Sequence, residues 1–123
     1  AQFTAAWDWN QTFFYNVMLN IDDPSTWNAG WQNPDVWCAW NRQMKEYALS
    51  AQERQNYRSY ISAGDYHTIM MSPDFYLENS GGIPFFMWVK AMVRNPFGLW
   101  GGPLEGLWKN LECEDCEDPV PCD

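Results

Sequence analysis

Residues 33–49, NPDVWCAWNRQMKEYAL, decide the fold that the sequence predicts. The stretch opens with an asparagine that can cap a helix and a proline that suits the first helical position. Trp37, Trp40 and Met44 then recur at helical spacing. Tyr47 falls on the same face. We therefore expect one helix over the whole stretch, with an aromatic face turned towards the core.

Four further segments are predicted to be helical, at residues 4–21, 50–63, 83–94 and 103–111. The first carries apolar side chains near helical spacing, the second opens with a capping-box pattern, and the third is almost wholly apolar. No alternation of apolar and polar residues is long enough to indicate a sheet. The predicted fold is mainly α, a small single domain of about five short helices with an aromatic-rich core.

The chain of 123 residues suffices for one domain and not for two with independent cores. Six of its sixteen acidic residues lie in the last twelve positions, where no basic residue accompanies them. We therefore expect an aromatic-rich helical domain over residues 1–111 and an irregular, acidic, cysteine-containing tail over residues 112–123 that packs on it.

Charge and hydropathy argue against two classes of partner. The formal net charge of −9 opposes an electrostatic hold on nucleic acid. The longest apolar stretch, residues 83–93, has eleven residues, whereas a membrane-spanning helix needs about twenty. We expect no nucleic-acid partner and no membrane span.

Four cysteines give the sharpest local signal, because Cys38 stands alone whereas Cys113, Cys116 and Cys122 lie in the tail. They permit three pairings, and two disulfides would hold the acidic tail in place, one of them by joining Cys38 to the tail. Paired cysteines would place the protein in the extracellular space or on the surface of a particle such as a virion.

A zinc site is the alternative interpretation of the same cysteines. The three tail cysteines would take Cys38 or His67 as the fourth ligand, but a second zinc knuckle is missing. A thiol-redox role is disfavoured because carboxylates surround Cys113 and Cys116 and would destabilise a thiolate. We expect disulfides, no metal and no other cofactor.

Aromatic residues are in excess, since 22 Trp, Phe and Tyr stand against only sixteen Leu, Ile and Val. A body of this size has limited interior for so many rings, so some of them should face another surface. The candidate interaction residues are Trp7, Trp27, Trp31, Phe97, Trp100 and Trp108. The function that we expect is a non-enzymatic structural or assembly protein, whose partners are other protein subunits in a complex, particle or filament.

Two other functions stay open. Trp27 and Trp31 could stack on a glycan or another small ligand. A pair of carboxylates could instead hydrolyse glycosides, with Asp8, which lies between two tryptophans, as the acid. Its candidate partners are Asp35, Glu46 and Glu53.

A serine–histidine triad is disfavoured by the sequence. His67 is the only histidine, and no Gly-x-Ser-x-Gly pattern accompanies it. We therefore interpret His67 as a structural group that is held by hydrogen bonds, and we expect no catalytic residue of this kind.

Overall fold

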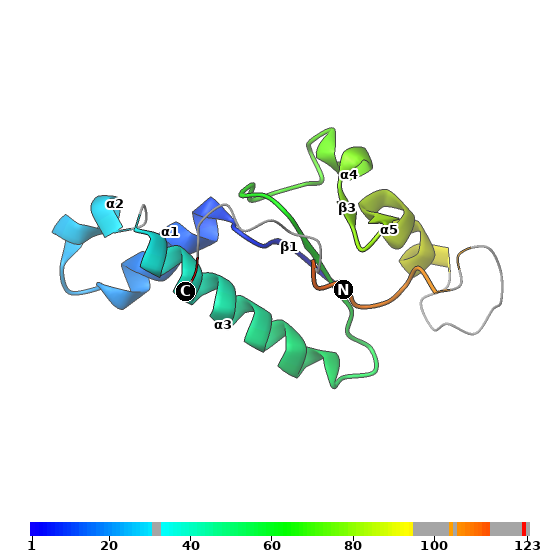
Figure 1. The fold of residues 1–123 in the computed structure, drawn as a ribbon, viewed down its shortest axis with the longest axis horizontal. Coiled ribbons are helices and arrows are strands. Elements are labelled where there is room, and N and C mark those ends of the chain that lie inside the picture. Colours follow the sequence, from blue (N-terminus) through cyan, green and yellow to red (C-terminus); the bar gives the residue numbers. More distant parts are fainter. Residues whose placement is uncertain (31–32, 95–103, 105, 114–121, 123) are drawn as a thin grey trace.

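In the computed structural model, which describes residues 1–30, 33–94, 104, 106–113 and 122, strands and helices alternate along the chain (Figure 1). The N-terminal strand β1 (Gln2–Ala5) leads into helix α1 (Trp9–Leu19), and the long helix α3 (Pro34–Gln52) leads into strand β2 (Ser59–Ser62). The smaller elements are a 3-10 helix (Pro24–Thr26), α2 (Trp27–Gly30), α4 (Asp74–Leu77), β3 (Asn79–Ser80) and β4 (Ile83–Pro84), and they are followed by α5 (Phe85–Arg94).

The strands β1 and β2 form a parallel pair, although more than fifty residues separate them in the sequence. Their register runs from Gln2 opposite Ser59 to Ala5 opposite Ser62. On its other side, β2 is bridged by Leu111, whose backbone N–H donates to the carbonyl of Ser59 at 2.9 Å. β2 is therefore the inner strand, and β1 has a strand on one side only in the part of the chain that the structure describes.

The prediction of a mainly α fold is wrong, because the chain forms a mixed α/β structure with two small sheets. All four residues of β2 are buried, including Ser59 and Ser62. A parallel strand that is covered on both faces shows no alternation of apolar and polar residues. The pattern that would have indicated a sheet is therefore absent from this strand.

The helix predicted at residues 4–21 is present as α1, but it begins only at Trp9 because residues 2–5 form β1. The helix predicted at residues 50–63 is wrong. The capping-box pattern at residues 50–53 lies in the last turn of α3 and does not start a new helix, and the apolar residues that follow it belong to β2. Of the predicted helix at residues 103–111, the part that is described consists of turns that lead to the bridge at Leu111.

The helix that was predicted from residues 33–49 is confirmed as α3. The side chain of Asn33 accepts a hydrogen bond from the backbone N–H of Asp35 at 3.0 Å, and Pro34 is the first helical residue. Trp40 and Met44 are buried as expected, whereas Tyr47 is exposed. The helix predicted at residues 83–94 is confirmed as α5, although its first two residues form β4.

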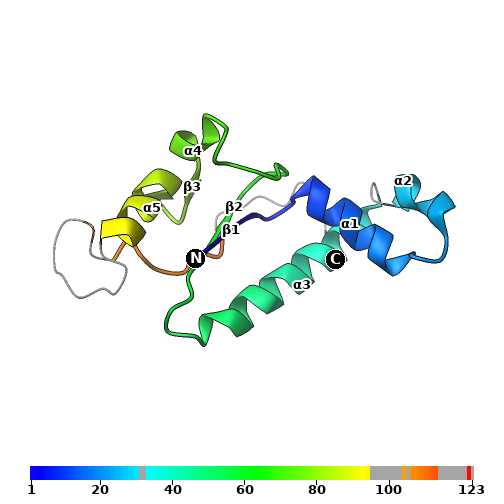
Figure 2. The ribbon, with the colours of Figure 1, turned by 180° about the vertical axis from the view of Figure 1, so that it is seen from behind.

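The core consists of two clusters, one on each face of β2, because successive strand side chains point in opposite directions. Ile61 packs with residues of α3, and Tyr60 packs with residues of α5. Figures 1 and 2 show α3 and α5 on opposite sides of the strand pair. The strands are therefore the middle layer between helices, as parallel strands require.

Aromatic rings fill the cluster on the α5 side, so that the aromatic-rich core is confirmed. The ring of Phe85 lies 4.7 Å from that of Phe3 and 5.0 Å from that of Tyr60, and Trp88 lies 5.5 Å from Tyr60, measured between ring centroids. The hydroxyl of Tyr60 donates to the carbonyl of Ile83 at 2.6 Å, so its one polar group is satisfied inside the core.

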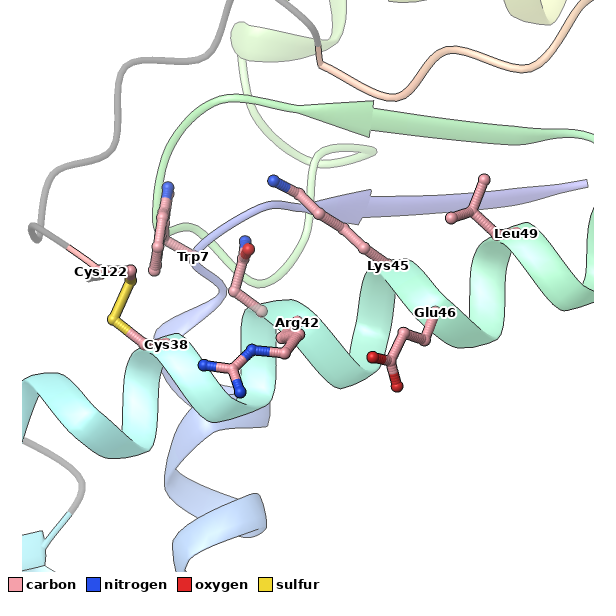
Figure 3. Close-up of a pocket in the computed structure, with 8 residues that line it drawn as sticks. Trp7, Cys38, Arg42, Lys45, Glu46, Leu49 and Cys122 are labelled. Carbon is pink, nitrogen blue, oxygen red and sulfur yellow. A yellow bond between two sulfur atoms is a disulfide. The ribbon is translucent and has the colours of Figure 1, made fainter.

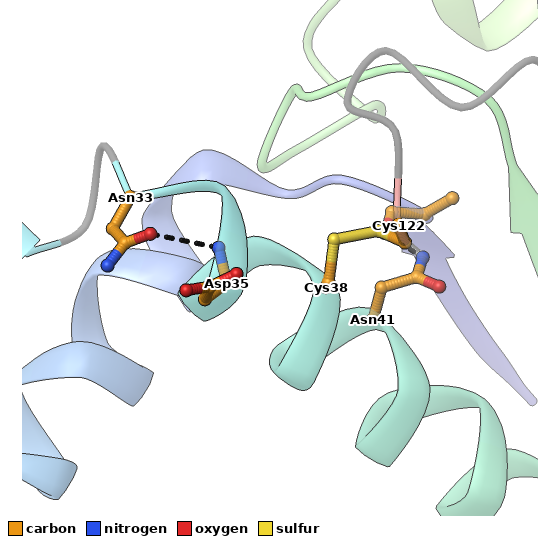
Figure 4. Close-up of a disulfide and its surroundings, with 6 residues drawn as sticks. Asn33, Asp35, Cys38, Asn41 and Cys122 are labelled. Atoms are coloured by element: carbon orange, nitrogen blue, oxygen red, sulfur yellow. Dashed lines mark hydrogen bonds between the residues drawn. A yellow bond between two sulfur atoms is a disulfide. The ribbon is translucent and has the colours of Figure 1, made fainter.

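A disulfide joins Cys38 on α3 to Cys122, with the two Cα atoms 5.6 Å apart (Figure 4). The expected link between Cys38 and the tail is therefore present. Cys113 is also disulfide-bonded and is buried in the cluster with Trp7 and Ile61. Sulfurs in disulfides are not available as zinc ligands, and within the described ranges no group of three His, Cys, Asp or Glu side chains could hold a metal ion.

Among the described residues, no helix is both long and apolar enough to cross a membrane.

Candidate functional site

Asp8 stands where the chain leaves β1 and enters α1, as the N-cap of that helix. Its Oδ1 accepts hydrogen bonds from the backbone N–H groups of Asn10 at 3.0 Å and of Gln11 at 2.9 Å. The side-chain amide of Gln11 donates to Oδ2 at 2.8 Å. The helix terminus therefore fixes this carboxylate in one orientation, in a position where negative charge is favoured.

His67 lies beyond the end of β2, in the loop that follows it. The loop turns at Gly64, whose φ of +99° belongs to the left-handed region that favours glycine. Two backbone hydrogen bonds tie this loop to the chain after β1, from Trp7 N–H to the carbonyl of Gly64 at 3.0 Å and from Trp9 N–H to that of Asp65 at 2.8 Å. The loops that carry Asp8 and His67 are thus held side by side.

The imidazole of His67 contacts the carboxylate of Asp8 through its Nδ1 atom, which lies 3.0 Å from Oδ2 and 3.1 Å from Oδ1. An ionised carboxylate only accepts hydrogen bonds, so a neutral His67 that donates to Asp8 from Nδ1 has Nε2 as its free nitrogen. Within the described part of the chain, Nε2 has no hydrogen-bond partner. This is the tautomer that can accept a proton from a third group.

The two side chains differ sharply in burial. The side chain of Asp8 is 1% exposed, whereas that of His67 is 43% exposed. Four donor atoms converge on the buried carboxylate, so its lone pairs are satisfied without water. The arrangement is a buried, rigid carboxylate that orients a histidine whose other edge faces outward.

Both residues follow the carboxyl end of their strand. In a parallel sheet these ends lie along one edge, and binding and catalytic residues of α/β proteins gather outside that edge. The parallel pairing of β1 with β2 is therefore the physical reason why Asp8 meets His67 across 59 positions of sequence. A helical fold would have offered no such reason.

Tyr66, the residue before His67, points away into the protein. Its hydroxyl lies 2.8 Å from the hydroxyl of Ser62. Burial, with a further contribution from Glu78, raises the pKa of Tyr66 above the ordinary value of 10.0. Tyr66 is thus a neutral group that ties the loop to β2 through its contact with the hydroxyl of Ser62, and it does not act as a base.

The three candidate interaction residues that the structure describes do not lie together. Trp7 is 1% exposed and belongs to the core, so its expected exposure is wrong. Trp27 is half-buried and donates from Nε1 to the carbonyl of Asn20 at 2.8 Å, and Trp108 packs on Trp88 at 4.6 Å between ring centroids. The remaining three, Trp31, Phe97 and Trp100, lie outside the described residues, as does Cys116.

The carboxylates that were paired with Asp8 in the glycosidase hypothesis lie on α3 or next to its end. Asp35 is in its first turn, Glu46 in its middle and Glu53 at its C-cap, and all three are exposed. None of them is a partner of Asp8, whose hydrogen bonds all come from N–H donors. A carboxyl group that accepts hydrogen bonds from four N–H donors is held in one orientation and can in turn orient a histidine.

Comparison of the chain with protein families, with curated proteins and with solved structures found no match.

Reasoning from the sequence named both Asp8 and His67 but did not connect them. The connection becomes visible only once a strand is seen to precede each of them.

Proposed function

We propose that Asp8 and His67 are the acid–base pair of a hydrolytic acyl-transfer site. The hydrogen bond between Nδ1 of His67 and the buried carboxylate of Asp8 carries the proposal. In such a site Nε2 removes the proton of a nucleophile while the nucleophile attacks a carbonyl carbon. The imidazolium that forms is stabilised by the carboxylate, and it then returns the proton to the leaving group.

The nucleophile in this proposal is a water molecule, which Nε2 activates as a general base. Among the residues that the structure describes, no serine, threonine or cysteine is hydrogen-bonded to Nε2. The segments outside the described residues contain no serine or threonine.

Hydrolysis of an activated ester tests the proposal on the chain alone, since an oriented imidazole attacks p-nitrophenyl acetate without a serine. We expect the chain to hydrolyse the ester faster than free imidazole does. The His67→Gln variant should lose this additional rate. Asp8→Asn should lower the rate, because it removes the charge that stabilises the imidazolium, and a correctly placed acid–base group contributes about 10²–10⁴-fold in a complete site.

Asp65→Asn is the matched control, because Asp65 is an exposed carboxylate in the same loop and bonds to Trp9 only through its backbone carbonyl. This variant should retain the wild-type rate. An unchanged rate in folded His67→Gln would refute the proposal.

A second proposal, association with other protein subunits, rests on the exposed apolar side chains. Phe14 and Met18 lie four residues apart on α1, on one face of the helix, and are 59% and 72% exposed. Large apolar side chains also remain exposed at the C-terminal end of α1 and beyond His67, namely Leu19, Ile21, Met70 and Met71. Such surfaces are typical of protein interfaces, and a subunit bound there would suit the assembly function that the sequence predicts.

Light scattering after size-exclusion chromatography tests the second proposal. The wild-type chain should associate as its concentration rises, and Met18→Ser should associate less while it retains its helical circular dichroism. A monomer at every concentration, in both proteins, would exclude self-association through this face and leave the Asp8–His67 proposal intact.

A further inference from the structure

Gln11 is the third residue of α1, and its side chain reaches back to the residue that caps this helix. Asp8 and Gln11 stand at the two positions of a capping box, in which the third helical side chain normally accepts the backbone N–H of the cap. Here that N–H is already donated to the carbonyl of Ala5, at 3.4 Å. The side chain of Gln11 donates instead, from Nε2 to Oδ2 of Asp8 at 2.8 Å. Gln11 therefore serves the carboxylate of the cap and not its backbone.

The two oxygens of the Asp8 carboxylate are held in different ways. Oδ1 accepts the backbone N–H groups of Asn10 and Gln11, which the helix itself fixes. Oδ2 accepts the side-chain amide of Gln11 and, at 3.0 Å, contacts Nδ1 of His67. Within the described ranges these are the two polar contacts of Oδ2, and that with Gln11 is the shorter. Gln11 is thus the group of α1 that holds Oδ2 towards the imidazole.

This contact requires an amide at position 11, because an ionised carboxylate accepts hydrogen bonds and does not donate them. For a capping box alone, glutamate would serve as well as glutamine, and its charge would also suit the positive end of the helix dipole. Beside the carboxylate of Asp8, a second carboxylate would be repelled and Oδ2 would lose its donor. The glutamine at position 11 therefore indicates a role beyond capping the helix.

We propose that Gln11 is a positioning residue of the Asp8–His67 pair, an inference that takes the function proposed above as its basis. Its amide fixes the plane of the Asp8 carboxylate so that Oδ2 meets Nδ1 of His67. The hydrogen of the neutral imidazole is thereby kept on Nδ1, and Nε2 stays free to take a proton. Without this amide, Oδ1 remains bound to the helix, but Oδ2 can turn away from the ring and the imidazole hydrogen moves to Nε2.

The ring nitrogens of His67 test this proposal directly, because it is the only histidine in the chain and its signals need no assignment. In protein labelled with ¹⁵N-histidine, at an alkaline pH at which the ring is neutral, the chemical shifts of the two nitrogens give the ratio of the Nδ1–H to the Nε2–H tautomer. We expect Nδ1–H to predominate in the wild type. Gln11→Met, which has a similar length and no donor, should lower the ratio about tenfold, as expected from the loss of one hydrogen bond to a charged group.

Gln11→Glu separates positioning from helix capping. If Gln11 only stabilised the start of α1, glutamate would leave the tautomer ratio at its wild-type value. The positioning role predicts that the ratio falls in this variant as well, because glutamate cannot donate to Oδ2, while the helical circular dichroism is retained. A wild-type ratio in Gln11→Glu would overturn the proposal.

Gln43→Met is the matched control, because Gln43 lies on α3 and its amide donates to the hydroxyl of Tyr47 at 3.1 Å. Its tautomer ratio should equal that of the wild type. The proposal is also overturned if Gln11→Met keeps the wild-type ratio, or if Nε2–H predominates in the wild type. The first of these results leaves the acid–base function intact, whereas the second removes the tautomer that this function requires. Esterolysis that is absent despite the expected ratios would refute the proposed function alone.

Discussion

The disulfide between Cys38 and Cys122 should supply much of the stability of the fold. It links positions 84 residues apart, and the entropy lost by the unfolded chain on closing such a loop corresponds to about 4.5 kcal/mol at 25 °C. The free energy of unfolding of a small domain is only about 5–15 kcal/mol in total. Replacing both cysteines, as Cys38→Ala with Cys122→Ala, should therefore remove a large share of the free energy of unfolding.

Urea unfolding, followed by far-ultraviolet circular dichroism and tryptophan fluorescence, measures this loss. We expect the free energy of unfolding to fall by about 3–5 kcal/mol, with a steeper dependence on urea because the uncrosslinked chain unfolds to a more expanded state. Wild-type protein with its disulfides reduced should be no more stable than the double variant, since reduction also opens the bond at Cys113. A loss below about 1 kcal/mol would refute the reasoning, because the loop entropy would then not act on the unfolded state.

Three further predictions concern the strands and the loops after them. Asp8→Ala removes the cap of α1 and the buried acceptor of four donors. It should cost about 2 kcal/mol or more in urea unfolding, and Asp65→Ala should cost almost nothing. Gly64→Ala should destabilise by about 1–2 kcal/mol, because φ is +99° there and a Cβ would lie 2.7 Å from the Tyr66 ring; equal stability would contradict the turn geometry. The pKa of Tyr66 is raised in the folded state, so its contribution to stability is complete below the unfolded value of 10.0 and is lost as the pH rises beyond it. Thermal unfolding between pH 9 and pH 11 should show this loss in the wild type and a weaker one in Tyr66→Phe, and identical pH profiles would contradict it.

The sequence was sufficient to predict α3, because every signal for that helix is local. Asn33 caps it, Pro34 suits its first turn, and Trp40 and Met44 mark its buried face. These features act within a few residues of one another and depend little on the rest of the molecule.

The strands could not be predicted in the same way. β1 and β2 have four residues each, and what makes them strands is their pairing with each other and with Leu111. Their burial on both faces removed the alternation that would have marked them, and the capping-box pattern before β2 favoured a helix. Pairing across the whole chain is a tertiary property, so local patterns gave the wrong secondary structure here.

The candidate site could not be predicted either, because it depends on the pairing of the two strands. Asp8 was named as the candidate acid of a glycosidase and His67 as a structural group held by hydrogen bonds, but their contact depends on the parallel pairing that the sequence did not reveal. The same is true of the pocket of about 320 Å³ between Trp7 and α3 (Figure 3), because it requires Cys122 to lie against α3 and Trp7 to be buried.

Modification of His67 tests the proposed acid–base pair most directly, because it is the only histidine in the chain. Diethyl pyrocarbonate adds to the unprotonated ring nitrogen, and the absorbance change counts the modified residues. Esterolysis should fall in proportion to the fraction of His67 modified, reach the background when one group has been added per chain, and return after treatment with hydroxylamine. Esterolysis that persists in fully modified protein would contradict the assignment of Asp8 and His67 as the acid–base pair.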